Sequence, residues 1–153
     1  MAAVEFTSKV FGVLTPDELY AMLKLRSEVF VVEQRCIYLD PDGREWGAQH
    51  LLGWSSVGSR TLICGARVLA PGAIYEEASI GRVVTSASHR GTGLARQVME
   101  RALAECARLY PSQPIRIEAQ RYVERFYASL GFVTVSEPFE EDGILHVMML
   151  RPG

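Results

Sequence analysis

The chain has 153 residues, which fits one globular domain over residues 1–153 with a single sizeable core. Hydrophobic residues make up 48% and charged residues 22%, a composition that argues against disorder. The net charge of −2 gives no basis for nucleic-acid or membrane binding, and no apolar run approaches the roughly 18 residues of a membrane span. The first residues lack a basic flank followed by an apolar stretch, so we expect no signal peptide and a cytoplasmic protein.

The three cysteines are widely spaced and odd in number. They are Cys36, Cys64 and Cys106, and no two of them form a CxxC pair. This pattern indicates neither a zinc knuckle nor a redox motif. We expect buried thiols in a reducing compartment, and no metal cofactor.

The first predicted helix begins after Thr15. Thr15 is a good N-cap, Pro16 suits the first turn, and Glu18 stands three residues after the cap, as in a capping box. Apolar residues then recur at roughly helical spacing as far as Phe30. The sequence Asp-Pro-Asp-Gly at residues 40–43 predicts a turn.

The middle of the chain predicts three strands and a long helix. Residues 50–72 have the composition of two strands around a turn at Gly58, and residues 79–85 are rich in β-forming residues. The following helix, residues 94–110, has one apolar stripe and ends at Pro111.

The last third of the chain alternates strand and helix again. Residues 114–120 alternate apolar and polar side chains, as a half-buried strand does. Residues 121–132 predict a second helix with Gly131 as its C-terminal stop, and residues 132–139 and 144–150 predict two further strands. The whole order predicts an α/β fold, a mixed sheet with helices on both faces.

A glycine turn stands directly before the long helix, in the sequence Arg90-Gly91-Thr92-Gly93. Its glycines let a ligand approach the backbone, and the helix dipole favours an anion at the first-turn amides. The chain lacks the Gly-Lys-Ser/Thr of a Walker loop, and Arg96 stands where a dinucleotide fingerprint needs glycine. A pyrophosphate is the anion that suits this turn, and a plain glycine-rich helix start is the alternative.

The segment Arg90-Gly91-Thr92-Gly93-Leu94-Ala95 resembles motif A, Gln/Arg-x-x-Gly-x-Gly/Ala, of the GNAT (GCN5-related N-acetyltransferase) superfamily. The later "RFYASLGF" resembles the motif B helix of the same superfamily. The stretches "LRSEVFVVEQRCIYLDPDG", "SIGRVVTS" and "EEDGILH" are similar to its ElaA-like branch. This resemblance extends from about Leu19 to Met149.

The resemblance implies the GNAT fold, a splayed, mixed and mostly antiparallel sheet, with acetyl-CoA as cosubstrate. It places the CoA pyrophosphate on the backbone of Arg90, Gly91, Thr92, Gly93, Leu94 and Ala95. It also pairs the pantetheine arm with the main chain of Val83, Val84 and Thr85, as a strand pairs with a sheet edge. The implied acceptor is an amine-bearing small molecule or peptide, and a homodimer is compatible with the family.

The implied reaction is direct transfer of an acetyl group to a primary amine in a ternary complex. An alkylammonium with a pKa of about 10.4 is neutral in about one molecule in 2,500 at pH 7. A general base, or a water chain leading to one, can remove its proton. The departing thiolate needs a proton, and Tyr127 matches the general-acid tyrosine of the family. The alternative for Tyr127 is a core tyrosine at helical spacing.

The general base is where the sequence departs from the family pattern. Many relatives carry a glutamate on the motif A strand, but this strand reads Ser79-Ile80-Gly81-Arg82. We rank Glu33 and His146 first, because both fall in ElaA-like stretches outside the CoA motifs. The other candidates are His50, Glu76, Glu77 and Glu118.

Two alternatives to this enzyme remain open. A CoA-binding regulatory module without turnover would explain the missing strand glutamate. An acyl-homoserine-lactone-synthase-like acyltransferase shares the GNAT scaffold and an early "LR…VF" stretch, here Leu25-Arg26 and Val29-Phe30.

Overall fold

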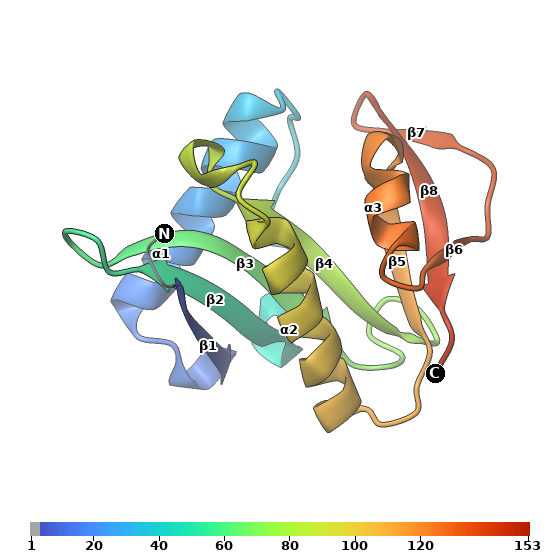
Figure 1. Ribbon diagram of the computed structural model, residues 1–153, viewed down its shortest axis with the longest axis horizontal. Helices are drawn as coiled ribbons and strands as arrows, with labels where there is room; N and C mark the ends of the chain where they lie inside the picture. Colours follow the sequence, from blue (N-terminus) through green and yellow to red (C-terminus); the bar gives the residue numbers. More distant parts are fainter. Residues whose placement is uncertain (1–3) are drawn as a thin grey trace.

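The computed structural model describes residues 4–153, and the strands in this range form one mixed sheet (Figure 1). The strands are β1 (Val4–Val10), β2 (Gln49–Ser55), β3 (Thr61–Leu69), β4 (Ala78–Thr85), β5 (Ile115–Gln120), β6 (Val133–Thr134), β7 (Phe139–Glu141) and β8 (Ile144–Arg151). Their order across the sheet is β1-β2-β3-β4-β5-β8-β6, and β7 also pairs with β8. Among these described strands only β4 and β5 pair in parallel.

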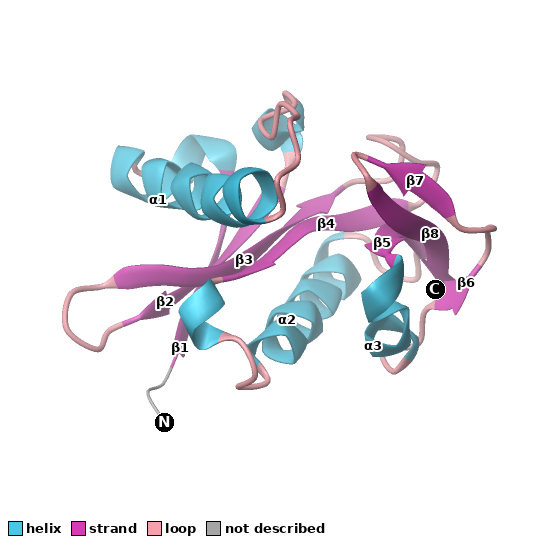
Figure 2. Cartoon of the chain, turned by 90° about the horizontal axis from the view of Figure 1, so that it is seen from above, coloured by secondary structure: helices cyan, strands magenta, loops and turns pink. Residues whose placement is uncertain are grey.

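Helices cover both faces of the sheet, as the element order predicts. Helix α1 (Pro16–Arg26) lies on one face, and α2 (Leu94–Leu109) and α3 (Glu124–Ala128) lie on the other (Figure 2). Short 3-10 turns occupy Phe11–Val13, Arg44–Gly47, Ala87–His89 and Arg121–Val123. No helix in residues 4–153 is both long and apolar enough to cross a membrane.

Helix α1 begins with the predicted capping box. The Thr15 Oγ1 atom accepts a hydrogen bond from the Glu18 amide at 3.1 Å, and Glu18 Oε1 accepts one from the Thr15 amide at 2.9 Å. Beyond Arg26 the helix changes to π geometry over Ser27–Glu33. The predicted helix is therefore confirmed, but its last two turns are wider than α-helical, a feature often found beside functional sites.

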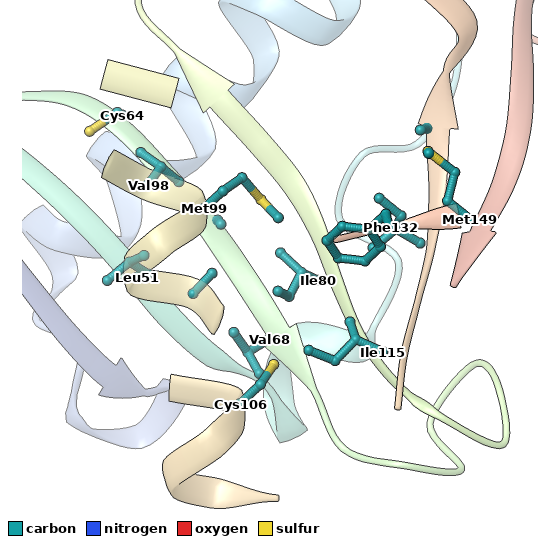
Figure 3. Packing of buried hydrophobic residues seen from close by; sticks show 14 of the residues in the cluster. Leu51, Cys64, Val68, Ile80, Val98, Met99, Cys106, Ile115, Phe132 and Met149 are labelled. Carbon is teal, nitrogen blue, oxygen red and sulfur yellow. The ribbon is translucent and has the colours of Figure 1, made fainter. Parts of the chain in front are cut away.

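The core has two parts, one on each side of the sheet. On the α2 side, Val98, Met99 and Cys106 of the helix pack against sheet residues such as Leu51, Val68, Ile80 and Ile115 (Figure 3). Between α1 and the opposite face lies a second cluster: Met22, Leu25, Val29, Leu52, Trp54, Leu62 and Val84. The α2 stripe expected from periodicity is thus confirmed, and burial of these side chains is the main force holding the layers together.

A buried ion network fixes the loop between the π segment and β2. Its members are Arg26, Asp40, Asp42, Glu45, Arg67 and Arg82. Arg26 Nε lies 2.7 Å from Asp40 Oδ2, and Arg67 Nη2 lies 2.7 Å from Asp42 Oδ2. Arg82 Nε lies 2.8 Å from Asp40 Oδ1. Each buried charge has an opposite partner, which burial requires.

Two predicted elements in the last third are shorter than expected. The helix of residues 121–132 is a 3-10 turn followed by the five residues of α3, and Gly131 (φ +95°) closes the following turn. The strand of residues 132–139 is reduced to β6, and Phe139 belongs to β7. Pro138 interrupts it, because proline has no amide hydrogen for a ladder. Strand β1 has no counterpart among the predicted elements.

Candidate functional site

Strands β4 and β5 pair only where they start and then separate. Their register contacts are Ala78 with Ile115 and Ser79 with Arg116. An open cavity of about 920 Å³ lies beyond this point and is bounded by both strands. Its volume is in the range of small-molecule binding sites.

The separation coincides with a distortion of β4. The register between β3 and β4 shifts between Gly65 and Arg67, and Arg82 adopts a left-handed φ of +50°. An Arg82 guanidinium nitrogen donates to the Asp40 carbonyl oxygen at 2.9 Å, so the buried ion network holds this strained residue in place. The distortion turns the end of β4 away from β5.

The cavity is walled by segments that are distant in the sequence. They are the π segment with the loop of residues 34–42 after it, β4, Arg90 and Ala95 on the two sides of the glycine turn, β5, the segment of residues 122–127, and the β7–β8 turn with the start of β8. Of the predicted cofactor-binding residues, the lining includes Val83, Val84, Thr85, Arg90 and Ala95. Of the predicted catalytic residues, it includes Glu33, Tyr127 and His146.

The glycine turn at one end of this cavity has the geometry expected of an anion site. Gly91 and Gly93 have φ values of +77° and +78°, and a Cβ added to either would meet no atom within 4 Å. Gly93 caps α2 without a side-chain hydrogen bond. The first amides of this 16-residue helix therefore remain available to a ligand.

Glu33 forms an ion pair with Arg90 beside the turn. Both terminal nitrogens of the Arg90 guanidinium donate to the Glu33 carboxylate, and Nη2 does so at 2.9 Å. Nη2 also donates to the Thr85 carbonyl oxygen at 3.2 Å. The hydrogen bond from Arg90 lowers the pKa of Glu33. A carboxylate held in this way is a poor proton acceptor, which argues against Glu33 as the base.

Tyr127 packs inside the cavity wall on α3. Its ring contacts Phe126 and Phe132 with centroid distances of 5.1 and 6.0 Å. None of the hydrogen bonds in the described part of the chain involves its hydroxyl group. Burial, with a smaller contribution from Tyr122, raises the pKa of Tyr127 to about 12, so the phenol stays protonated at neutral pH.

Three titratable side chains meet on another wall of the cavity. One carboxylate oxygen each of Glu118 (β5) and Glu141 (β7) and one imidazole nitrogen of His146 (β8) all lie within 4.8 Å of one another. Desolvation, followed by the hydrogen bond and charge of Glu141, raises the pKa of Glu118 to about 8. The His146 ring stacks on Phe139, and its Nδ1 lies 2.8 Å from the Ile144 carbonyl oxygen.

Comparison with known proteins identifies the family of this chain. The family model described as "Acetyltransferase (GNAT) domain" matches residues 61–151, more than half of the chain. The chain is a member of the GNAT family. This GNAT chain is also 41% identical over 140 residues to protein ElaA of Escherichia coli, with 90% of each chain covered.

Solved structures agree with this assignment. A crystal structure of an acyl-CoA N-acyltransferase from Pseudomonas aeruginosa is 41% identical to this GNAT chain, with a TM-score of 0.89 over 96% of this chain and 99% of that one. The Escherichia coli ElaA structure is 38% identical, with a TM-score of 0.90 over 97% and 99%. The acyl-homoserine-lactone synthase LasI, 14% identical with a TM-score of 0.75 over 98% and 90%, shares the fold alone.

The remaining base candidates of this GNAT chain do not line the cavity. His50 is fully buried, its Nε2 lies 2.9 Å from the Glu45 carbonyl oxygen, and burial lowers its pKa. Glu77 is paired with Arg116 at 3.0 Å, where β4 and β5 still run together. Glu76 is likewise absent from the cavity lining.

All three cysteines are buried and free, as their spacing predicts. Cys64 and Cys106 belong to the core on the α2 side of the sheet. Cys36 lines the cavity, and burial together with the charge of Asp142 raises the pKa of its thiol. No disulfide connects these residues.

Proposed function

We propose that the chain transfers an acetyl group from acetyl-CoA to a primary amine of a small molecule or peptide. The observation that carries this proposal is one cavity that joins the glycine turn, the unpaired edge of β4 and Tyr127. A cytoplasmic location and the absence of nucleic-acid and membrane partners belong to the same proposal, and a homodimer is compatible with it.

The cofactor end of the cavity suits CoA in both charge and backbone geometry. The pyrophosphate would accept hydrogen bonds from the amides of residues 90–95, where the helix dipole and Arg90 favour an anion. The pantetheine arm would pair with the main chain of residues 83–85, because β5 no longer occupies that side of β4.

The chemistry needs a carbonyl activated for attack and a proton for the leaving sulfur. A backbone amide near Val84 would stabilise the negative charge that develops on the thioester oxygen. Tyr127 would donate its hydrogen bond to the sulfur, and the proton would move as the C–S bond breaks and be replaced from solvent. No covalent enzyme intermediate is required, because the cavity holds both substrates together.

The test is release of CoA thiol from acetyl-CoA with a panel of primary amines. We expect Tyr127→Phe to lower kcat by about 100-fold or more while the acetyl-CoA Kd changes less than about twofold. Tyr20→Phe is the control, because Tyr20 is exposed on α1 and does not line the cavity. Unchanged turnover in Tyr127→Phe would remove Tyr127 from the acid role.

A regulatory CoA-binding module is the second candidate, and it is favoured by the absence of a carboxylate on β4 along the cavity. If the chain is such a module, CoA should bind tightly and no amine should cause release of CoA thiol from acetyl-CoA. An acyl-carrier-protein donor in place of acetyl-CoA would instead indicate a reaction like that of the acyl-homoserine-lactone synthases. The same thiol assay, run with acetyl-CoA and with an acyl-carrier-protein donor, distinguishes the three candidate functions.

A further inference from the structure

We propose that Glu118 and Glu141 bind the acceptor as an alkylammonium group that carries no neighbouring carboxylate, and that Glu118 accepts its proton. This inference rests on the proposed function and assigns the acceptor end of the same cavity. His146 completes the group, as the third side chain of the cluster formed by Glu118, Glu141 and His146.

The first argument is the charge at this wall of the cavity. Asp142 follows Glu141 and also lines the cavity, so three carboxyl groups lie close together. The positive charge that acts on Glu118 is that of Arg82, whose guanidinium is paired with Asp40 at 2.8 Å and with Asp42 at 3.5 Å. The wall therefore has an excess of negative charge, which attracts an ammonium group and repels a second carboxylate.

The second argument is independent of these carboxyl groups. Half-buried Tyr127 lines the same cavity, and none of the hydrogen bonds within residues 4–153 involves its hydroxyl, so this group can bind a ligand atom. The cavity wall also includes Ile117 and Ile144, which can contact an alkyl chain. An acyl donor and an amine bound together in this cavity would contact Tyr127, the two isoleucines and the carboxyl groups.

The proton balance of the reaction fits these positions. The alkylammonium gives one proton to the Glu118 carboxylate and becomes a neutral amine. Its nitrogen then attacks the thioester carbon, so a C–N bond forms and the C–S bond breaks. The nitrogen loses its second proton to solvent as the amide forms, while Tyr127 gives its proton to the CoA sulfur and regains one from solvent. The net release is one proton per turnover, the one that leaves Glu118 for solvent.

The elevated pKa of Glu118 sets a direction for the pH dependence. The groups facing it are Glu141, Asp142, His146, Arg82 and Tyr75. A base must be deprotonated, so we expect kcat/KM to rise with pH with an apparent pKa of about 8, that of Glu118. Glu141→Gln removes a like charge, so this rise should move to lower pH.

The variants are Glu118→Gln and Glu141→Gln, with Glu140→Gln as the matched control. Glu140 is the exposed neighbour of Glu141 and does not line the cavity. We expect Glu118→Gln to lower kcat by about 100-fold. Glu141→Gln should raise KM for the amine by about tenfold and shift the pH profile. All three should keep the wild-type Kd for acetyl-CoA, which also reports that each variant is folded.

The acceptor class is tested with matched pairs that differ only in a carboxylate. Phenethylamine is compared with phenylalanine and isobutylamine with valine, because in each amino acid the carboxylate lies next to the only amine. A peptide with an internal lysine separates peptide from small-molecule sources of the ammonium. We expect the amines to exceed the amino acids by at least about tenfold in kcat/KM, whichever source is preferred. Glu141→Gln should reduce the ratio of kcat/KM for amines to that for amino acids, because it removes a negative charge that repels the substrate carboxylate.

Several results would overturn the inference while leaving the proposed function intact. They are wild-type activity and pH profile in Glu118→Gln, equal use of amines and amino acids, or activity lost to EDTA and restored by Zn²⁺. The last would make the three side chains a metal site. Failure of the wild-type protein to release CoA with any amine contradicts the proposed function itself.

Discussion

At the scale of single residues, Arg90 has two competing partners. In the free protein its guanidinium is held by Glu33 and by the Thr85 carbonyl oxygen. The proposed CoA pyrophosphate would lie at the same turn, so the Glu33 carboxylate would stand next to an anion. We therefore propose that Glu33, ranked as a base from the sequence, opposes cofactor binding instead.

We expect Glu33→Gln to tighten acetyl-CoA binding by about threefold at low salt, because it removes a negative charge near the anion site. The gain should fade at high salt, since both side chains are partly exposed and therefore screened. Isothermal titration calorimetry at two ionic strengths measures it. Glu28→Gln is the control, because Glu28 belongs to the same π segment but pairs with Lys24. Weaker binding in Glu33→Gln would show that Glu33 instead orients Arg90.

At the scale of secondary-structure elements, the buried ion network joins α1, β3 and β4 through one loop. Asp40 is central, because it meets both Arg26 and Arg82 and accepts a hydrogen bond from the Tyr38 hydroxyl at 2.9 Å. Through Arg82 it also holds the distorted part of β4. Stability and the shape of the cavity therefore depend on the same carboxylate.

Asp40→Asn should lower the free energy of unfolding by about 3–5 kcal/mol, because it leaves the buried Arg26 and the half-buried Arg82 each short of a negative partner. Urea unfolding followed by circular dichroism measures this change. Asp17→Asn on the exposed start of α1 is the control and should stay within about 0.5 kcal/mol. A loss in Asp40→Asn no larger than in the control would mean that the network contributes little net stability.

The elements with a strong local signal were predictable from the sequence. Helix α2 follows its apolar stripe, and α1 begins at the capping box of Thr15. The cluster of Glu118, Glu141 and His146 was not predictable as a cluster, because its members meet only through the pairing of β5 and β7 with β8. Such register is a long-range property, and a two-residue strand such as β6 carries too little periodicity to be recognised.

At the scale of the whole molecule, the sheet has two parts joined at one short parallel contact. Strands β1 to β4 form one part and β5 to β8 the other (Figure 1). The cavity is lined by residues of both parts. A ligand that pairs with β4 and also meets α3 would link the parts. Binding should therefore stabilise the fold as a whole and not only the glycine turn.

Acetyl-CoA at 100 times its Kd should add about 2.7 kcal/mol to the free energy of unfolding. Hydrogen exchange should slow at the amides of residues 83–85 and 91–95, whereas the distant edge strand β1 should change little. Mass spectrometry of peptic fragments, with and without acetyl-CoA, measures both regions in one experiment. Protection confined to other segments would contradict the proposed cofactor position.

The burial of Cys36 affects which nucleophile can attack an acyl donor in the cavity. A thiolate beside a thioester can take the acyl group itself, which would divert the acetyl group onto the protein. Cys36 lines the cavity, but its raised pKa keeps it in the thiol form at neutral pH, and a thiol is a weak nucleophile. If acetyl-CoA binds as proposed, a protonated Cys36 would leave the acyl donor intact for the amine, although this sulfur atom lies in the cavity wall.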